Sequence, residues 1–161
     1  MGLKQISGSA FQGCASMEKI ELPDSLTSIN LSAFAGCKSL KRIEIPQFVE
    51  YLTSHALNME EVIVHPDNRK YYSLDNCILR KSDNVIISGG QYSTIPKTAT
   101  AIGEDAFSGN TLKQITVPGN IKTIGRGAFS GASLNEITIE NGVEEIGAAF
   151  GSCNLKKLVI P

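Results

Sequence analysis

Short runs in which apolar and polar residues alternate recur along the chain and predict half-buried β-strands. Residues 42–46 show the pattern most clearly, with the sequence Arg-Ile-Glu-Ile-Pro. Strict alternation places one set of side chains in a core and the other set in solvent. The proline ends the strand because it has no N–H to donate to a neighbouring strand. Matching runs lie at residues 17–23, 112–118, 134–139 and 155–161.

A second motif separates these strands and turns the chain back. It has the form Ala-Phe-x-Gly, in which the small alanine permits tight packing, the phenylalanine fills the interior, and the glycine accepts a positive φ at the corner. A short extended stretch precedes most copies, for example at residues 26–29 and 121–124. The motif places large apolar side chains at Phe11, Phe34, Phe107, Phe129 and Phe150, with Leu57 at the equivalent place.

Copies that follow each other directly are 21 to 23 residues apart. A period of this length is typical of a solenoid, in which each unit buries its apolar set only by stacking on the next unit. Two apolar ladders are expected to run through the strands, two residues apart. The first contains Ile20, Ile43, Val62, Ile115, Ile137 and Leu158, and the second contains Leu22, Ile45, Val64, Val117, Ile139 and Ile160.

The repeat fails once, where the corner after Leu57 is short by about three residues relative to the other units. An insertion follows at about residues 65–99. Within it, the runs at residues 71–74, 77–80 and 85–87 predict a β-hairpin. We expect the insertion to extend one coil of the solenoid rather than to form a domain.

Three of the four cysteines share one column of the repeat. Cys14, Cys37 and Cys153 each lie three residues after a corner phenylalanine, whereas Cys77 lies outside the column. We expect small buried thiols that fill the core. A Cys14–Cys37 disulfide is not favoured, because equivalent positions on successive coils point in parallel rather than at each other.

The joint recurrence of these features resembles the BspA-like class of leucine-rich repeats over nearly the whole chain. The shared pattern is Ile-x-x-x-Ala-Phe-x-x-Cys-x-x-Leu-x-x-Ile-x-Ile-Pro-x-x-Val-x-x-Ile. The resemblance implies a mainly β fold, a right-handed leucine-rich-repeat solenoid with a parallel sheet on one face and short strands and turns on the other. Residues 1–161 would form a single solenoid of about six units. The resemblance also implies a bacterial surface protein, from a family in which several members attach to host proteins such as fibronectin and fibrinogen. It transfers no catalytic residues, because the family has no catalytic motif.

Composition excludes several functional classes. The net charge is −1 and no cluster of Lys or Arg is present, so the basic face of a nucleic-acid-binding protein is missing. No apolar run is long enough for a membrane span, and the first residues lack the apolar core of a signal peptide. The last unit stops at Pro161, directly after its strand. We therefore expect a fragment of a longer protein, in which any signal peptide would lie outside this chain.

Residues that carry chemistry do not form a recognisable constellation. His55 and His65 have no metal ligands at suitable spacing. The glycine-rich residues 125–131 lack the Lys-Ser/Thr ending of a phosphate loop. Four acidic or amide residues of the insertion are interpreted as turn formers, because they lack the spacing of a calcium loop: Asp67, Asn68, Asp75 and Asn76. The sequence therefore predicts no catalytic residue, no metal and no cofactor.

The outward-facing strand side chains are the first candidate binding surface, because they do not serve the core and such ladders usually form the binding face of a repeat protein. They are Lys19, Glu21, Arg42, Glu44, Glu61, Gln114, Thr116, Glu136, Thr138 and Lys157. The insertion is the second candidate, because Tyr71, Tyr72 and Tyr92 are of a type favoured as interface anchors. The alternative interpretation of the strand residues is a solvated face of mixed charge, since no aromatic cluster marks a hot spot.

These observations favour a non-catalytic protein-binding solenoid, within an adhesin-type protein that is secreted or held on the bacterial cell surface. Its partner would be a protein, for instance a host matrix or plasma protein, and neither nucleic acid nor membrane insertion is expected. The alternative is a structural spacer or self-assembly segment of a larger surface protein, because uncapped coils expose apolar edges that associate end to end.

Overall fold

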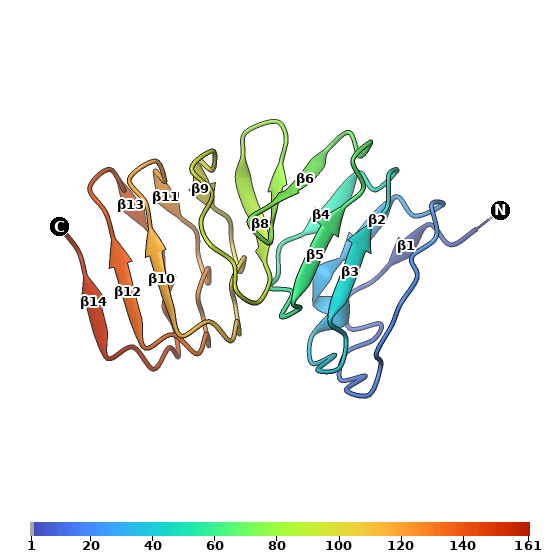
Figure 1. Cartoon of the computed structure of the whole chain (residues 1–161), viewed down its shortest axis with the longest axis horizontal. Helices are drawn as coiled ribbons and strands as arrows, with labels where there is room; N and C mark the ends of the chain where they lie inside the picture. The colour runs from blue at the N-terminus through green and yellow to red at the C-terminus, as the bar shows by residue number, and fades with distance from the viewer. Residues whose placement is uncertain (1) are drawn as a thin grey trace.

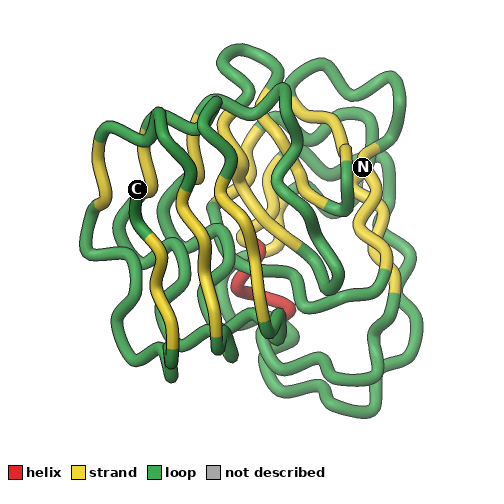
Figure 2. Tube along the Cα trace, turned by 60° about the vertical axis from the view of Figure 1, so that its left-hand side comes forward, coloured by secondary structure: helices red, strands yellow, loops and turns green. Residues whose placement is uncertain are grey.

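The computed structural model describes residues 2–161, which wind into an elongated stack of coils. The N- and C-termini lie at opposite ends of the stack (Figure 1). The coils carry strands on two sides, and loops join the two sides (Figure 2). The mainly β solenoid that the repeats predict is therefore confirmed.

The strands that the alternating pattern predicts form one side of the stack, which we call the strand face. It carries β3 (Arg42–Ile45), β5 (Glu61–Val64), β10 (Gln114–Val117), β12 (Glu136–Ile139) and β14 (Lys157–Val159). The second face carries β1 (Gln5–Ile6), β2 (Ser28–Asn30), β4 (Tyr51–Thr53), β6 (Tyr71–Leu74), β7 (Cys77–Arg80), β8 (Val85–Gly89), β9 (Ala101–Ile102), β11 (Thr123–Ile124) and β13 (Glu145–Ile146). The only helix among residues 2–161 is the 3-10 turn η1 (Leu31–Phe34).

The sequence predicts a parallel sheet on one face and short strands on the other, and in the structure the short strands also pair into sheets, with an interruption on each face. The strand face divides into β3-β5 and β10-β12-β14. The second face divides into β1-β2-β4 and the six-stranded sheet β13-β11-β9-β8-β7-β6. The second face becomes a sheet because its short extended stretches also stack in register and exchange backbone hydrogen bonds, for example where Ile6 pairs with Ile29. On both faces the interruption falls at the insertion.

The insertion forms two consecutive hairpins, and their strands β7 and β8 are largely buried on both faces. Strands β6, β7 and β8 pair antiparallel, as residues 71–87 predict, and β8 then pairs parallel with β9. Cys77 and Leu79 enter one apolar core, while Ile78 between them enters another. A strand covered on both sides needs a continuous apolar run, which Cys-Ile-Leu and Val-Ile-Ile supply. The insertion thus separates the interior into an N-terminal core and a C-terminal core.

The corner phenylalanines stack through both cores. Ring centroids lie 5.6 Å apart for Phe11 and Phe34, and 5.3 and 5.5 Å apart on the two sides of Phe129. Leu57, at the equivalent place in the sequence, is buried in the N-terminal core. Next to Phe107 the column passes to Gly89 of the insertion, where a Cβ atom would collide with the Phe107 ring. The predicted column is therefore present, and the insertion joins it through a residue without a side chain.

Residues 17–23 do not form the strand that their alternation predicts. Ile20 and Leu22 are only half-buried, and a cavity of about 300 Å³ separates this segment from β3. This hollow keeps the segment out of the ladder of β3, so no backbone pairing holds it in the pleat. At the other end, Leu158 and Ile160 are exposed because no coil within residues 2–161 covers the last one.

The turn-forming residues of the insertion act as expected at three positions. Asn68 is buried, and its side-chain oxygen accepts hydrogen bonds from the backbone N–H groups of Lys70 and Tyr71, both at 2.9 Å. Asp75 and Asn76 adopt positive φ angles of 51° and 60° in the turn between β6 and β7. Both arrangements are ones that Asn and Asp tolerate better than other residues.

Candidate functional site

The outward-facing strand residues fall into two groups, one on each side of the insertion. Lys19 and Glu21 lie on the irregular segment beside β3, and the others lie on strands. All are exposed except Glu136 and Thr138, which are half-buried because β12 lies between two other strands.

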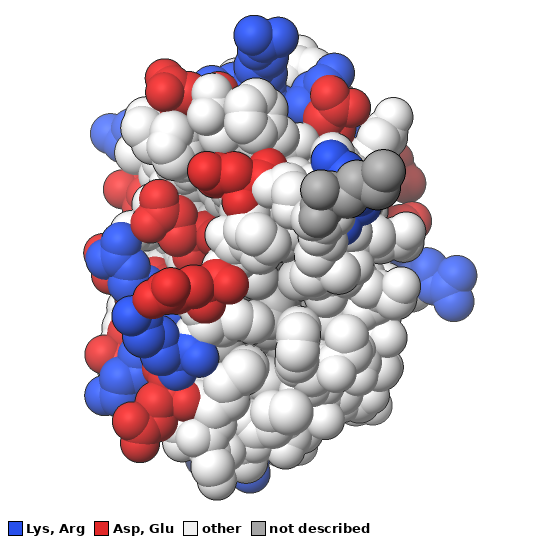
Figure 3. All heavy atoms as spheres, turned by 90° about the vertical axis from the view of Figure 1, so that its right-hand side faces the viewer, with Lys and Arg blue, Asp and Glu red and all other residues white. Residues whose placement is uncertain are grey.

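The N-terminal group consists of charges that already pair with one another. Arg42 donates to Glu61 at 2.8 Å and to Glu44 at 3.4 Å. Lys19 contacts Glu21 at 2.6 Å, and this hydrogen bond lowers the pKa of the Glu21 carboxyl. Acidic and basic side chains gather together along one side of the N-terminal end, while the central and lower part of this end is largely uncharged (Figure 3). Water screens such exposed pairs, so the N-terminal group agrees with the interpretation of a solvated face of mixed charge.

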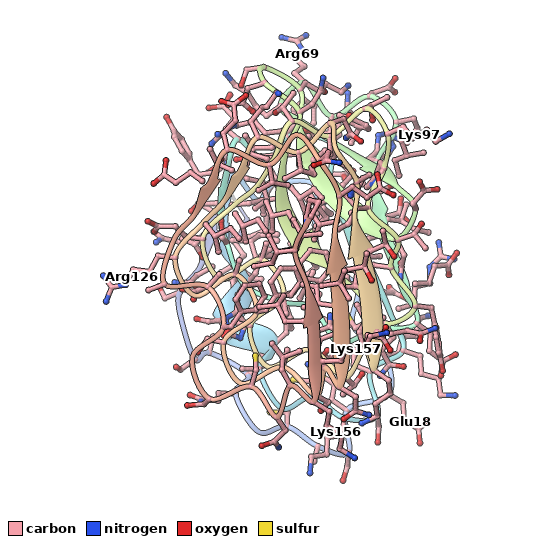
Figure 4. All side chains as sticks on the ribbon, turned by 90° about the vertical axis from the view of Figure 1, so that its left-hand side faces the viewer. Glu18, Arg69, Lys97, Arg126, Lys156 and Lys157 are labelled. Atoms are coloured by element: carbon pink, nitrogen blue, oxygen red, sulfur yellow. The ribbon has the colours of Figure 1, made fainter. Side chains whose placement is uncertain are left out.

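The C-terminal group is mainly uncharged. Gln114 and Thr116 lie on β10 and Thr138 lies beside them on β12. The one ion pair here joins Lys157 and Glu136 at 2.6 Å. Figure 4 places Lys97 and Lys157 on this side of the molecule and Arg126 on the opposite side.

A groove of about 520 Å³ lies beside this uncharged group. Residues 93–97 form one wall, β10 forms the other, and Ile95 and Ile115 are nearly buried between them. The alternating patterns described above do not predict this groove. The signal is present, however, because the insertion ends in Ser93-Thr-Ile95-Pro96, which has a serine where the other units carry the first apolar ladder residue.

A second hollow of about 510 Å³ lies at the short corner after Leu57. Its lining includes His55, Asn58 and Met59. Burial lowers the pKa of His55, which favours the neutral imidazole. The Asn58 amide donates to the Gly109 carbonyl at 2.9 Å and accepts from the Thr111 N–H at 3.2 Å, so it takes the place of part of the missing corner.

The three tyrosines of the insertion do not form a joint surface. Tyr71 is buried, contrary to expectation, because its hydroxyl joins the edges of two sheets: it accepts from the Leu52 N–H at 3.1 Å and donates to the Glu50 carbonyl at 3.3 Å. Tyr72 is half-buried and donates to Asn84 at 2.9 Å. Tyr92 alone is fully available, with 76% of its surface exposed.

The cysteine column is a hydrogen-bonding column as well as a packing column. Cys37 donates to the Phe11 carbonyl at 3.2 Å, and Cys153 donates to the Phe129 carbonyl at 2.7 Å. Cys14 is exposed rather than buried, because no coil precedes its own among residues 2–161. Cys77 is buried outside the column, and all four thiols are free.

Two structural features are absent from residues 2–161. In this part of the chain no group of three or more His, Cys, Asp or Glu side chains is arranged to hold a metal ion. None of the described segments is a helix of the length and apolar character needed to cross a bilayer.

A family model, the BspA type leucine rich repeat region, matches residues 1–83 and 88–161 in six copies. No curated protein matches the chain significantly.

Three solved structures share the fold. A leucine rich cell surface protein from Faecalibacterium prausnitzii superposes with a TM-score of 0.70 at 24% identity, over 99% of this chain and 52% of that one. The pneumococcal vaccine antigen PcpA superposes with a TM-score of 0.70 at 21% identity, over 97% of this chain and 48% of that one. A leucine-rich repeat protein from Eubacterium ventriosum superposes with a TM-score of 0.60 at 22% identity, over 88% of this chain and 47% of that one. The chain thus spans about half the length of these proteins.

Proposed function

Since this chain belongs to the BspA-type leucine-rich repeat family, we propose that it is a non-catalytic protein-binding solenoid of a secreted or cell-surface bacterial protein. The observation that carries the proposal is the C-terminal half of the strand face. There Gln114, Thr116 and Thr138 lie beside a groove of about 520 Å³ and have no role in the core. An uncharged surface costs less to desolvate than the paired charges of the N-terminal half.

The location is proposed from the same relatives. One structural neighbour is described as a cell surface protein and another as a vaccine antigen. Because they are under 25% identical to this chain and about twice as long, they support the proposal through their fold only. An adhesin that attaches to host matrix or plasma proteins is the specific form of the proposal.

Binding to immobilised fibronectin and fibrinogen tests this function. We expect Thr116→Arg to weaken binding about tenfold or more, because a long cation would occupy the uncharged surface, a change worth about 1.4 kcal/mol. Arg42→Glu, on the charged N-terminal half, and Arg126→Glu, on the opposite side, are control charge reversals that should leave binding unchanged. The proposal fails if neither protein binds, or if the Thr116 variant binds as well as the two control variants do.

End-to-end assembly is a second candidate function, favoured by the apolar edge of the last coil. Ile146, Leu158 and Ile160 are 37%, 45% and 57% exposed. Large exposed apolar patches are typical of association surfaces. Light scattering against concentration tests this function, and Leu158→Lys should abolish any growth in mass. A constant monomer mass up to millimolar concentration would exclude it.

A further inference from the structure

We propose that the free edge of β10 is a docking site for an extended peptide segment of a partner protein, which pairs there as an added strand. The inference rests on the proposed protein-binding function and names the mode of binding. In Figure 1, β10 begins the second half of the strand face, where the β3-β5 sheet has ended. The free edge therefore lies in the middle of the solenoid.

The pairing of β10 is one-sided. Strand β12 lies between β10 and β14, with Ile137 opposite Ile115 and Leu158. Strand β10 has β12 on one edge, and no strand within residues 2–161 pairs with the other edge. An edge of this kind presents a row of N–H and C=O groups to any chain that can lie alongside.

The direction of individual groups follows from the ladder. The carbonyls of Lys113 and Val117 accept hydrogen bonds from residues next to or within β12. Backbone groups alternate in direction along a strand, so the N–H and C=O groups of Gln114 and Thr116 point into the groove. The edge thus offers two donors and two acceptors, which match the backbone of an extended peptide.

The insertion does not cover this edge, because its polar groups are used elsewhere. It caps β5 with side chains: the N–H of Val62 donates to Asn76 Oδ1 at 2.8 Å, and the N–H of Val64 donates to Ser73 Oγ at 3.1 Å. The segment opposite β10 is tied back to the insertion, since the Thr94 N–H donates to the Asp75 carbonyl at 3.3 Å.

The serine at the ladder position holds this segment away from β10. Ser93 Oγ lies 2.8 Å from the Asn76 carbonyl and 2.9 Å from the Gly90 carbonyl, so its hydroxyl is directed into the insertion. Pro96 has no N–H to offer. The coil that should supply the neighbouring strand therefore leaves a space beside β10, which is the groove of about 520 Å³.

The walls of the groove define the peptide that fits. Ile95 and Ile115 form an apolar floor, which suits small or β-branched side chains on one face of the peptide. The other face would lie among Thr116, Thr138, the exposed Lys97 and Glu136, whose carboxylate pairs with Lys157. Backbone pairing would supply the affinity, and the alternating side chains would supply the selectivity. Because the lining holds one cation and one paired carboxylate, a segment with uncharged outward residues is preferred.

A peptide with the sequence of β10 is a suitable probe. It can pair with the free edge of β10 in the same way that β10 pairs with β12. The experiment uses the whole chain and a capped synthetic peptide with the sequence of residues 112–118. Amide hydrogen exchange is followed by NMR. Near saturation we expect the Gln114 and Thr116 amides of the protein to exchange about tenfold more slowly, because both become hydrogen-bonded.

Two N-methylated peptides provide a matched control. Methylation at peptide residues 115 and 117 removes the donors that would face the protein and should abolish the protection. Methylation at 114 and 116 removes donors on the far edge and should preserve it. Equal effects of the two peptides, or no protection at Gln114 and Thr116, would overturn the proposal.

The same measurement also distinguishes a peptide partner from a second copy of this chain, and a wrong docking mode from a wrong proposed function. Protection of Gln114 and Thr116 that rises with protein concentration alone would show that a second copy of this chain fills the edge, and would overturn the proposal of a peptide partner. If a host protein binds while these two amides remain unprotected, the docking mode is wrong and the proposed function stands.

Discussion

At the scale of single residues, side chains in the repeat do two jobs, filling the interior and completing hydrogen bonds between coils. The phenylalanine column shows the first job. The residues three positions later show the second, since Cys37 and Cys153 donate to a carbonyl of the preceding coil. Asn110 occupies the same column and donates to the Gly89 and Gly90 carbonyls at 3.1 and 3.2 Å. A cysteine column in a sequence of this type therefore does not imply disulfides.

Removal of one ring from the phenylalanine column should be costly. Phe129 is fully buried between Phe107 and Phe150. We expect Phe129→Ala to lower the free energy of unfolding by about 3–5 kcal/mol, through lost burial and a cavity that its neighbours do not fill. Urea denaturation measures the loss. Phe48→Ala is the control, because that ring is 55% exposed, and a similar loss for both variants would contradict the assignment.

Stability should fall at alkaline pH because of a buried thiol. Burial raises the pKa of Cys77 from 9.0 to about 12. Below pH 9 both states hold the proton and the thiol has no effect. As the pH rises above 9 the unfolded chain ionises while the folded chain does not, so the free energy of unfolding should fall by about 1.4 kcal/mol per pH unit up to about pH 12.

Denaturation at pH 8 and at pH 10.5 measures this dependence. Cys77→Ala should have a flatter pH profile than the parent chain. Equal slopes for the two proteins would show that Cys77 is not the titrating group.

At the scale of elements, edges decide where the sheets stop. A segment with the alternating pattern pairs as a strand only if the neighbouring strand has unpaired backbone N–H and C=O groups within reach. Side chains of the insertion cap the edge of β5, and a hollow separates residues 17–23 from the edge of β3. At the outer edge of β4, the Leu52 N–H donates to the Tyr71 hydroxyl instead of to another strand. These edges depend on residues distant in the sequence, so the local pattern does not determine them.

The Tyr71 hydroxyl should contribute measurably to stability. Tyr71→Phe leaves the Leu52 N–H without its acceptor, and we expect a loss of about 1–2 kcal/mol in the free energy of unfolding. Thermal or urea denaturation measures it. The same deletion at exposed Tyr92 should have no effect. An unchanged free energy of unfolding for Tyr71→Phe would mean that water accepts the hydrogen bond of the Leu52 N–H in the variant.

At the scale of the whole molecule, the insertion is a partition between two cores. Adjacent residues of β7 serve different halves, because Ile78 packs in the N-terminal core and Leu79 in the C-terminal core. Both side chains are fully buried. The two halves of the solenoid are therefore joined through a hairpin rather than through a continuous sheet.

Truncation of these two neighbours should loosen opposite halves of the molecule. Ile78→Ala and Leu79→Ala should each cost about 2–5 kcal/mol. Hydrogen exchange should then accelerate mainly in β1–β5 for the first variant and mainly in β9–β13 for the second. Identical exchange patterns in both variants would show that the two cores unfold as one unit.

The repeat unit of this protein is predictable from the amino-acid sequence: its period, its strands at residues 42–46 and 112–118, its phenylalanine column and the antiparallel strands of the insertion. These features depend on local alternation and on side-chain size, which are visible in a single repeat. Three features emerge only from the packing of the coils, namely the burial of Tyr71, the missing strand at residues 17–23 and the free edge of β10. Each of these depends on which coil lies alongside and which of its groups are already hydrogen-bonded. The candidate site exists because the Ser93 hydroxyl is hydrogen-bonded within the insertion and does not pack beside β10.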